Sequence, residues 1–502
     1  MKIQLLLGLT LTLSFGVQAQ ELSGYTLNED SADCGGFAKV NVGTQSDHCV
    51  GIVASAEDGL RRPRRIIQIE GGDFLITDMY GWVANRGIVW RYFAKEKKLQ
   101  KILTGVDHAH GLAQGPDGLV YVGERSKIFR FDPNHPEATK EYVITNLPLE
   151  GSHPLTHFIF DKEGDLYVNA GAPSDQCLDE DKKPIYPCVY EDEAAIRKYF
   201  RTSNGEYDAN FKVVALGLRN SMGLAIHPET GQLYQAENNM DFDLDDGPKE
   251  EVNQIIEGAH YGWPYCYDDG LLNPKYKRTF FNRRIPKINC QSYEAPVATL
   301  PSHSAPLDML FYQGDMFPEL KGKLLLSLHG YRETGHRIVS LDLNKNDSYN
   351  EIVNQWSAKE GVRPKGAPVG MTVAKDGSLW FVEDKNKTIM VLKKGEKAQE
   401  REEQDSASFV IRDAMVNEYS TLSKSIFANR CQSCHSSFQG TEDESLKNLI
   451  QEGWIKPGEA EKSPLYLRIK DGDFGRQMPP TPKKLSTEEV NQVKDFINGL
   501  KD

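Results

Sequence analysis

The sequence predicts an all-β six-bladed β-propeller followed by a small all-α domain. A short phrase, in which a turn rich in aspartate and glycine leads into an alternating apolar strand, recurs between residues 60 and 395. A charged segment without apolar periodicity follows, and beyond it apolar residues recur at helical spacing. We therefore expect a propeller over 20–395, a linker over 396–408 and a helical domain over 409–502.

The recurring phrase gives the number of blades. It reads "IEGGDFLITD" at its first occurrence and "AKDGSLWFVED" at its last, with a glycine just before each strand. The six glycines are Gly72, Gly118, Gly164, Gly231, Gly322 and Gly377. One four-stranded blade takes about 40–50 residues, so the spacing fits six blades, some with long insertions. A β-sandwich has similar turns, but six repeats favour a propeller.

In the helical domain, Ser486 followed by Glu488 and Glu489 predicts the start of a helix.

The first residues predict export. Lys2 precedes an apolar run over 5–17 and small residues around Ala19, which is the layout of a signal peptide over 1–19. The run is shorter than the roughly 20 apolar residues of a membrane-spanning helix, and no other stretch is long and apolar enough. We expect a periplasmic or secreted protein without a membrane span.

The charge balance excludes some classes of partner. The chain has a formal net charge of −13 and no block rich in lysine and arginine. Nucleic acid and anionic membrane surfaces are therefore poor candidate partners.

Eight cysteines support an oxidising compartment. Two belong to a motif described below, and the other six form couples that are adjacent in the sequence. Six cysteines allow about 15 pairings, and the sequence does not choose among them. Local closure is the simplest arrangement, and disulfides are more common than free thiols in exported proteins. Local closure would join Cys34 to Cys49, Cys177 to Cys188 and Cys266 to Cys290.

The stretch "RCQSCHSSFQG" at 430–440 contains the attachment pattern of a c-type haem. Cys431 and Cys434 would form the thioether bonds, and His435 would bind the iron. Met478, in "GRQMPP", is the candidate sixth ligand, which suits electron transfer. Met415 lies in a helical pattern and is expected in the core. A redox dithiol is the alternative, but the helical setting and the Met-Pro-Pro segment favour haem, and the domain resembles a class I monohaem cytochrome c.

Three phrases of the propeller carry a second resemblance. They are "GSHPLTHFIFDKEGDLYV" (151–168), "LGLRNSMGLAIHPETGQLYQAEN" (216–238) and "EEVNQIIEGAHYGWP" (250–264). Found together and in this order, they resemble the soluble quinoprotein sugar dehydrogenases, including the sorbosone and pyranose dehydrogenase-like group. These are six-bladed propellers that bind pyrroloquinoline quinone (PQQ) with calcium. The resemblance covers roughly residues 55–395.

The resemblance implies roles for individual residues. His153 matches the family's catalytic base, although it could instead form a metal-binding pair with His157 or be an exposed loop histidine. Arg219 would stabilise the reduced quinone and Asn220 would hydrogen-bond its ring; a surface salt bridge is the alternative for Arg219.

The resemblance also places calcium in the loop after "LYQAEN". Asn239 and Met240 align with its backbone donors, and Asn238 would face the cofactor. This loop is longer and more acidic than the family pattern. Its carboxylates could bind a hard cation or simply be solvated. They are Asp241, Asp243, Asp245 and Asp246.

One departure concerns the charge partners of the cofactor. The family often has an arginine just before the Pro-Val-Gly of its last blade, and this chain has Ala367 there. Lys365 or Arg363 could substitute from the same loop, with Arg332 and His329 across the pocket.

The predicted chemistry also follows from general requirements. Oxidising a sugar hydroxyl with a quinone needs a base for the O–H proton, cations or donors at the quinone oxygens, and basic partners for the cofactor's carboxylates. We expect a PQQ-dependent sugar dehydrogenase with calcium and haem c that passes electrons to an external acceptor. The alternatives are a carbohydrate- or protein-binding propeller that carries a cytochrome, and a propeller hydrolase that uses the acidic loop and calcium.

Overall fold

The computed structural model divides the chain into two compact units, 1–397 and 398–502. It describes residues 21–22, 25–26, 33–45, 47–190, 192–242, 247–280, 282–330, 334–343, 349–354, 366–395, 413–430, 438, 441–451, 454–470 and 485–500. The predicted signal peptide and linker lie outside these residues.

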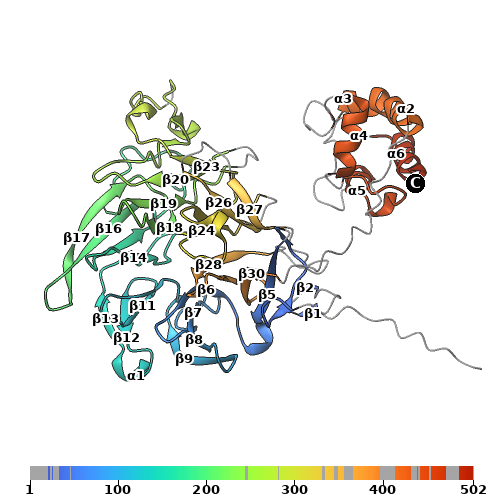
Figure 1. The fold of residues 1–502 in the computed structure, drawn as a ribbon. Helices are drawn as coiled ribbons and strands as arrows, with labels where there is room; N and C mark the ends of the chain where they lie inside the picture. Colours follow the sequence, from blue (N-terminus) through green and yellow to red (C-terminus); the bar gives the residue numbers. More distant parts are fainter. Residues whose placement is uncertain are drawn as a thin grey trace, which may run out of the picture. The chain divides into compact units, whose positions relative to one another are not determined.

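The first unit is a six-bladed β-propeller, as predicted (Figure 1). The first three blades are β6 (Pro63–Gln68), β7 (Phe74–Asp78), β8 (Gly87–Phe93) and β9 (Lys98–Val106); β10 (Leu112–Gln114), β11 (Val120–Gly123), β12 (Ile128–Phe131) and β13 (Glu141–Ile144); and β14 (Phe158–Phe160), β15 (Leu166–Ala170), β16 (Ala195–Arg201) and β17 (Tyr207–Leu216). A short helix, α1 (Pro136–Thr139), precedes β13.

The other three blades complete the ring. They are β18 (Ser221–Ile226), β19 (Leu233–Glu237), β20 (Glu250–Gln254) and β23 (Ala298–Leu300); β24 (Pro306–Phe311), β25 (Leu324–Leu328), β26 (Arg337–Leu341) and β27 (Tyr349–Asn354); and β28 (Pro368–Val373), β29 (Leu379–Glu383), β30 (Thr388–Lys394) and β5 (His48–Ala54). Because β5 comes from the other end of the sequence, the last blade joins both ends of the propeller and closes the ring. The first strands of successive blades are neighbours around the axis, and β28 returns to β6.

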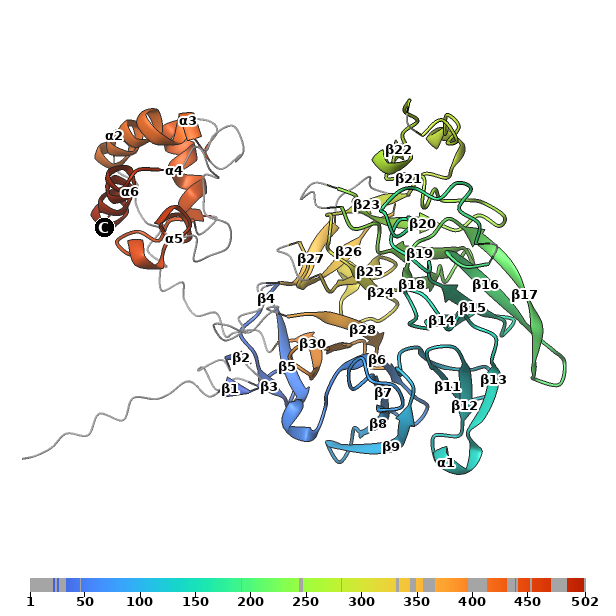
Figure 2. The ribbon, with the colours of Figure 1, turned by 180° about the vertical axis from the view of Figure 1, so that it is seen from behind.

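Short strands extend two of these sheets or stand apart from them. β3 (Ala38–Lys39) pairs with β5, and β4 (Gly43–Thr44) pairs with β27. β1 (Glu21–Leu22) pairs with β2 (Tyr25–Thr26). An insertion between β20 and β23 contains β21 (Cys266–Tyr267) and β22 (Leu271–Leu272), and it projects from the blades (Figure 2).

The six repeated glycines have the role that the phrase predicts. Each lies two residues before the second strand of its blade, and each has a φ between 71° and 96°. A residue with a Cβ rarely adopts this left-handed conformation, whereas glycine does so at little cost. The glycines therefore permit the tight turn between the first and second strand of each blade.

The three predicted disulfides are confirmed: Cys34–Cys49, Cys177–Cys188 and Cys266–Cys290. The first joins the segment before β3 to β5. The second closes a loop between β15 and β16, and the third ties the ends of the insertion that contains β21 and β22. Disulfides of this kind are typical of an oxidising compartment.

The second unit is helical in its described part. It contains α2 (Asp413–Leu422), a π-helical turn (Ser423–Phe427), α3 (Ala428–Arg430), α4 (Glu442–Gln451), α5 (Pro464–Lys470) and α6 (Thr487–Gly499). Ser486 caps α6 as predicted, and Glu489 completes a capping box. Met415 is buried in the hydrophobic core of this unit, also as predicted. None of the described helices is long and apolar enough to cross a membrane.

Candidate active site

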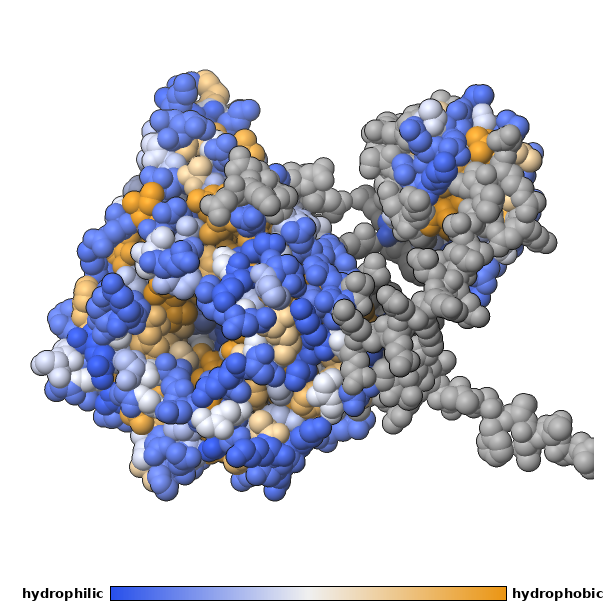
Figure 3. Space-filling view, viewed as in Figure 1, coloured by the Kyte–Doolittle hydropathy of each residue, from blue (hydrophilic) through white to orange (hydrophobic). Residues whose placement is uncertain are grey.

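One edge of the propeller holds His153, Arg219, Asn220 and residues 238–240 of the predicted site. The first two strands of a blade are antiparallel, so the chain entering the first strand and the chain leaving the second lie at the same edge. His153 precedes β14, Arg219 and Asn220 precede β18, and 238–240 follows β19. Neighbouring loops of the third and fourth blades thus supply the site. Figure 3 shows a face of the propeller that is hollowed near its middle.

His153 is held in one tautomer. Its Nδ1 lies 2.6 Å from the carbonyl oxygen of Ala172. A carbonyl oxygen only accepts hydrogen bonds, so Nδ1 carries the proton and Nε2 keeps its lone pair. Burial, reinforced by the positive charge of Arg219, lowers the pKa of His153 to about 4. The imidazole is therefore neutral near pH 7 and can accept a proton at Nε2.

The backbone of Ala172 connects His153 to Arg219. Its N–H donates to the carbonyl oxygen of Arg219 at 2.7 Å, while its own carbonyl receives the hydrogen bond from His153. A Cβ on the preceding residue, Gly171, would lie 2.5 Å from the Cβ of His153. Only glycine at this position lets the imidazole pack so closely against the strand end.

The guanidinium of Arg219 has a fixed orientation. Its Nε donates to Asp175 at 2.9 Å, its Nη2 to Asp241 at 3.0 Å and its Nη1 to the carbonyl oxygen of Asn238 at 2.8 Å. The Arg219 side chain is buried, but those of Asp175 and Asp241 are 36% and 65% exposed. Solvent can reach both carboxylates, so they can exchange the arginine for water or a ligand. Arg219 thus forms ion pairs, as the alternative interpretation allows, but its own side chain is buried at the edge that also holds His153.

The side chains after β19 are held by contacts within the propeller. Asn238 donates to the carbonyl oxygen of Pro306 at 2.8 Å, Asn239 donates to Glu251 at 3.0 Å, and the Met240 side chain is buried. Within the described part of the chain, the backbone oxygens of Asn239 and Met240 accept no hydrogen bond. Such oxygens are ligands that calcium accepts, so this segment fits a hard cation through its backbone. Asn220, in contrast, contributes its backbone oxygen to Met222 and Asn238.

Three buried glutamates beneath this segment were missed by the sequence prediction. Glu250 accepts from the backbone N–H of Asn239 at 2.6 Å, and Glu237 accepts from that of Arg219 at 2.5 Å. Glu251 lies opposite Glu237 across β19 and β20. Burial raises the pKa of Glu250 and of Glu251 to about 8, and it raises that of Glu237 well above its ordinary value. These carboxyls hold the backbone of both site loops, but "LYQAEN" and "KEEVNQ" read as ordinary strand sequence.

A second basic cluster lies where the last blade meets the first. Arg64, at the start of β6, donates to Asp384 at 2.7 Å and to Nδ1 of His110 at 3.1 Å. The other carboxylate oxygen of Asp384 lies 2.9 Å from Nε2 of His329. The backbone N–H of Asp384 donates to the carbonyl oxygen of Ala367. His329 and Arg64 hold the pKa of Asp384 below its ordinary range. A buried arginine from the first blade thus lies beside Ala367, which the sequence prediction did not identify.

Other predicted residues of the propeller site lie outside the described residues. They are Arg332, Lys365 and the alternative Arg363, together with Asp243, Asp245 and Asp246 of the acidic loop. His157, which could have paired with His153, is buried and its ring makes no hydrogen bond within the described part. No group of three or more His, Cys, Asp or Glu among the described residues is arranged to hold a metal ion.

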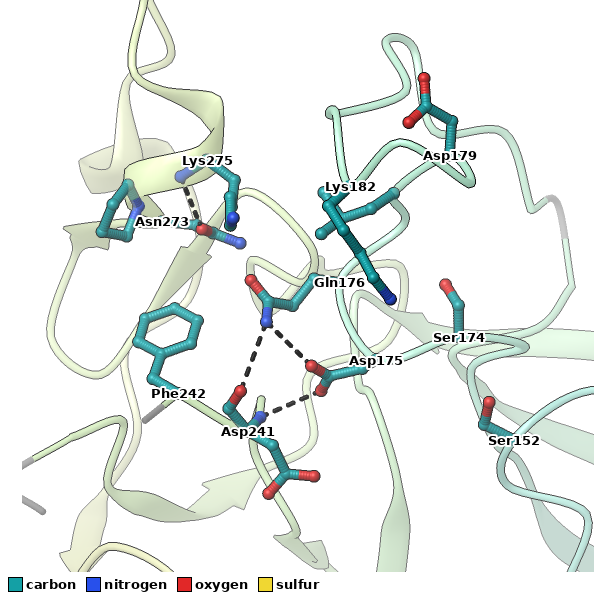
Figure 4. A pocket seen from close by; sticks show the side chains of 12 residues that line it. Ser152, Ser174, Asp175, Gln176, Asp179, Lys182, Asp241, Phe242, Asn273 and Lys275 are labelled. Carbon is teal, nitrogen blue, oxygen red and sulfur yellow. Dashed lines mark hydrogen bonds between the residues drawn. The ribbon is translucent and has the colours of Figure 1, made fainter. Parts of the chain in front are cut away.

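A cavity of about 580 Å³ adjoins the site (Figure 4). Ser152, next to His153, lines it, and so do Asp175 and Asp241, the two partners of Arg219. Gln176 and Phe242 line it as well. We call it the Phe242 cavity. A space of this size next to a neutral histidine and an oriented arginine is suited to a small-molecule ligand.

The predicted haem ligands also lie outside the described residues: Cys431, Cys434, His435 and Met478. The helix α3 ends at Arg430, immediately before the first of them.

Comparisons with known proteins agree with this architecture. Residues 45–395 match the TrAA12-like family. An uncharacterized protein of Borreliella burgdorferi is 33% identical over 360 residues, which cover 65% of this chain and 84% of that protein. A pyrroloquinoline quinone-dependent sugar dehydrogenase of Hypocrea jecorina is 23% identical over 332 residues, covering 56% of this chain and 73% of that enzyme.

Solved structures show the same fold. A Trichoderma reesei enzyme of carbohydrate-active enzyme family AA12 superposes with a TM-score of 0.56 at 20% identity, covering 70% of this chain and 98% of that one. The PQQ domain of a pyranose dehydrogenase from Coprinopsis cinerea gives a TM-score of 0.55 at 17% identity, covering 72% and 100%. These structures share the fold, and the family model matches more than half of the chain, so the chain belongs to the TrAA12-like family.

Proposed function

We propose that this protein is an exported PQQ-dependent sugar dehydrogenase that delivers electrons through its own c-type haem to an external acceptor. The observation that carries the proposal is a neutral His153, with the lone pair of Nε2 free, beside an oriented Arg219 on a TrAA12-like propeller. Two similar proteins are named as a PQQ-dependent sugar dehydrogenase and as a PQQ domain of a pyranose dehydrogenase.

His153 acts as the general base in this proposal. Oxidation of a sugar hydroxyl removes a proton from oxygen and a hydride from carbon, and Nε2 of His153 takes the proton. Ala172 keeps the imidazole in the required tautomer through its hydrogen bond to Nδ1. Arg219 supplies positive charge where negative charge develops on the acceptor. Bound PQQ would supply the two-electron acceptor for the hydride.

The chain offers residues for each part of the cofactor site. Asn220 and Asn238 lie beside Arg219 and would contact the quinone, while the backbone oxygens of Asn239 and Met240 would bind calcium. The carboxylates of PQQ need basic partners. His329 is a described candidate for this role beside Arg332 and Lys365.

The helical unit would carry the electrons onward. Cys431 and Cys434 would bind haem c covalently, with His435 and Met478 as axial ligands. Both axial positions are then filled by the protein, so the haem transfers electrons and does not bind substrate. Residues 1–19 would direct the protein to the periplasm or the medium, in agreement with its three disulfides.

Reconstitution tests the proposal. The purified full-length protein is loaded with PQQ and calcium, and a panel of aldoses and pyranoses is screened for reduction of the haem absorption bands. We expect stoichiometric PQQ binding and haem reduction by at least one sugar. His153→Ala should lower the rate by about 10²–10⁴-fold, the usual contribution of a general base, and leave the haem spectrum unchanged. A protein that binds no PQQ, or an H153A variant with an unchanged rate, would contradict the proposal.

A further inference from the structure

The Phe242 cavity is larger than a single sugar requires. At about 580 Å³ it falls within the range of roughly 300–1,000 Å³ for sites that enclose drug-sized ligands of some two to three dozen non-hydrogen atoms. A monosaccharide has about half that number. The cavity therefore has room for sugar units beyond the one that reacts, and Ser152 and Asp175 connect it to His153 and Arg219.

Its walls are fixed by hydrogen bonds between the loop that joins β15 to β16 and the insertion that joins β20 to β23. The hydroxyl of Tyr276, within the 266–290 insertion, donates to the carbonyl oxygen of Cys177 at 2.9 Å. The indole N–H of Trp263 donates to the carbonyl oxygen of Asp175 at 2.7 Å. These hydrogen bonds hold the two walls together, and walls held in place lower the entropic cost of binding.

Phe242 gives the cavity an apolar surface. Its ring packs edge-to-face on Tyr267, with 5.3 Å between the ring centroids, and it is half-buried. In Figure 4 the ring borders the cavity across from Lys182 and Ser174. A flat aromatic surface of this kind matches the C–H face of a pyranose ring.

Hydrogen-bonding groups of both kinds surround this aromatic surface. The amide NH₂ of Gln176 donates to Asp175 and to the carbonyl oxygen of Asp241, while its Oε1 has no hydrogen-bond partner within the described part of the chain. Lys182 and Lys275 line the cavity and form no ion pair with any described residue. A cavity that offers both donors and an acceptor beside an aromatic ring suits a neutral polyhydroxylated ligand, whose hydroxyls both donate and accept.

We propose that the Phe242 cavity binds the non-reacting units of a neutral oligosaccharide, with Phe242 as the stacking platform for the unit next to the reacting one. The assignment of the reacting end rests on the proposed function; the binding of an oligosaccharide to the cavity does not. The substrate class would accordingly be short glycans of two or three units rather than monosaccharides alone.

Binding is measured first, on the full-length protein without PQQ, so that the result does not depend on turnover. Calorimetry is carried out with cellotriose, maltotriose, mannotriose and xylotriose, and with glucose, mannose and xylose. We expect at least one trisaccharide to bind about tenfold or more tightly than its monosaccharide. Equal affinity of all trisaccharides and monosaccharides, or no binding of any trisaccharide, would overturn the proposal.

Variants locate the binding. Phe242→Ala should lower the affinity for the best-binding trisaccharide by about fivefold or more. Phe242→Tyr, which keeps the flat ring, should retain most of the parent affinity. Phe280→Ala is the matched control, because Phe280 is also an aromatic residue of the fourth blade, is 72% exposed and does not line the cavity. An F242A variant with unchanged trisaccharide affinity would overturn the assignment, as would F280A weakening binding equally.

Turnover separates this inference from the proposed function. In the PQQ-loaded enzyme, F242A should lower the ratio of kcat/KM for the trisaccharide to that for the monosaccharide. If no sugar reduces the haem but the trisaccharide still binds through Phe242, the dehydrogenase proposal fails and the cavity remains a glycan-binding site. If monosaccharides are oxidised and no trisaccharide binds, only the cavity assignment fails.

Discussion

Arg219 and Arg64 lie at the same edge of the propeller, and both pair with carboxylates. The two pairings differ in how far solvent reaches the carboxylates. Asp175 and Asp241, the partners of Arg219, are loop residues that solvent reaches, the first half-buried and the second exposed. Asp384, the partner of Arg64, is only 3% exposed and also binds His329. Exposed carboxylates can leave an arginine because water replaces their hydrogen bonds, whereas a buried one cannot. Arg219 is therefore available to a ligand, while Arg64 is part of the closure between the last and first blades.

The comparison predicts a large loss of stability when Arg64 is replaced. Arg64→Met leaves the Asp384 carboxylate buried, with His329 as its one remaining side-chain partner among the described residues, and breaking a buried pair in this way costs about 3–5 kcal/mol. The free energy of unfolding of the propeller, from denaturant titration, measures it. The double variant R64M/D384N, which removes both charges, should regain a large part of the loss. An R64M variant as stable as the parent would show that Asp384 does not need this arginine.

Replacing Arg219 should act on the reaction. Arg219→Met removes a cation from the position where charge develops, which typically lowers kcat by about 10²–10³-fold. Haem reduction in the PQQ-loaded protein measures this rate. The matched control, Asp241→Asn, changes an exposed partner and should alter the free energy of unfolding by no more than about 1 kcal/mol. A normal rate for R219M would remove Arg219 from the proposed mechanism.

Calcium should stabilise the propeller through the backbone of Asn239 and Met240. A ligand at 100 times its dissociation constant stabilises the folded state by about 2.7 kcal/mol, so a chelator should lower the melting temperature by several degrees. Readdition of calcium should restore it, and magnesium, which binds reluctantly without its water shell, should not. Identical melting curves with calcium and with chelator would rule out this site.

The pH dependence of kcat/KM should follow His153. A base must be unprotonated to act, and burial beside Arg219 places the pKa of His153 at about 4. The rate should therefore be constant above about pH 5 and fall as the pH drops through about 4. Because Arg219 contributes to this lowering, R219M should shift the inflection to higher pH. An inflection near 6.5 in the parent enzyme, the ordinary value for histidine, would show that His153 is not the buried base described here.

The blade repeat was predictable because it is local. A turn glycine and the alternation of the strand behind it lie within about ten residues, so each phrase carries its own signal at all six positions. The disulfides followed from the same locality, since each cysteine bonds to its neighbour in the sequence. His153, Arg219 and the segment after β19 were found only because their phrases resemble a known family, and their roles stay predictions.

The sequence alone determined that the turn-and-strand phrase repeats six times and where the tight turn of each blade lies. It also showed which loops carry histidine, arginine or several carboxylates. The tertiary structure alone decided which of these residues meet. Arg64 and Asp384 are 320 positions apart, and the pair forms only because β5 and β30 bring the two ends of the propeller together. Likewise, the Phe242 cavity needs a loop of the third blade and an insertion of the fourth. The first of these contacts depends on closure of the ring and the second on packing between neighbouring blades, and no local pattern of residues encodes either.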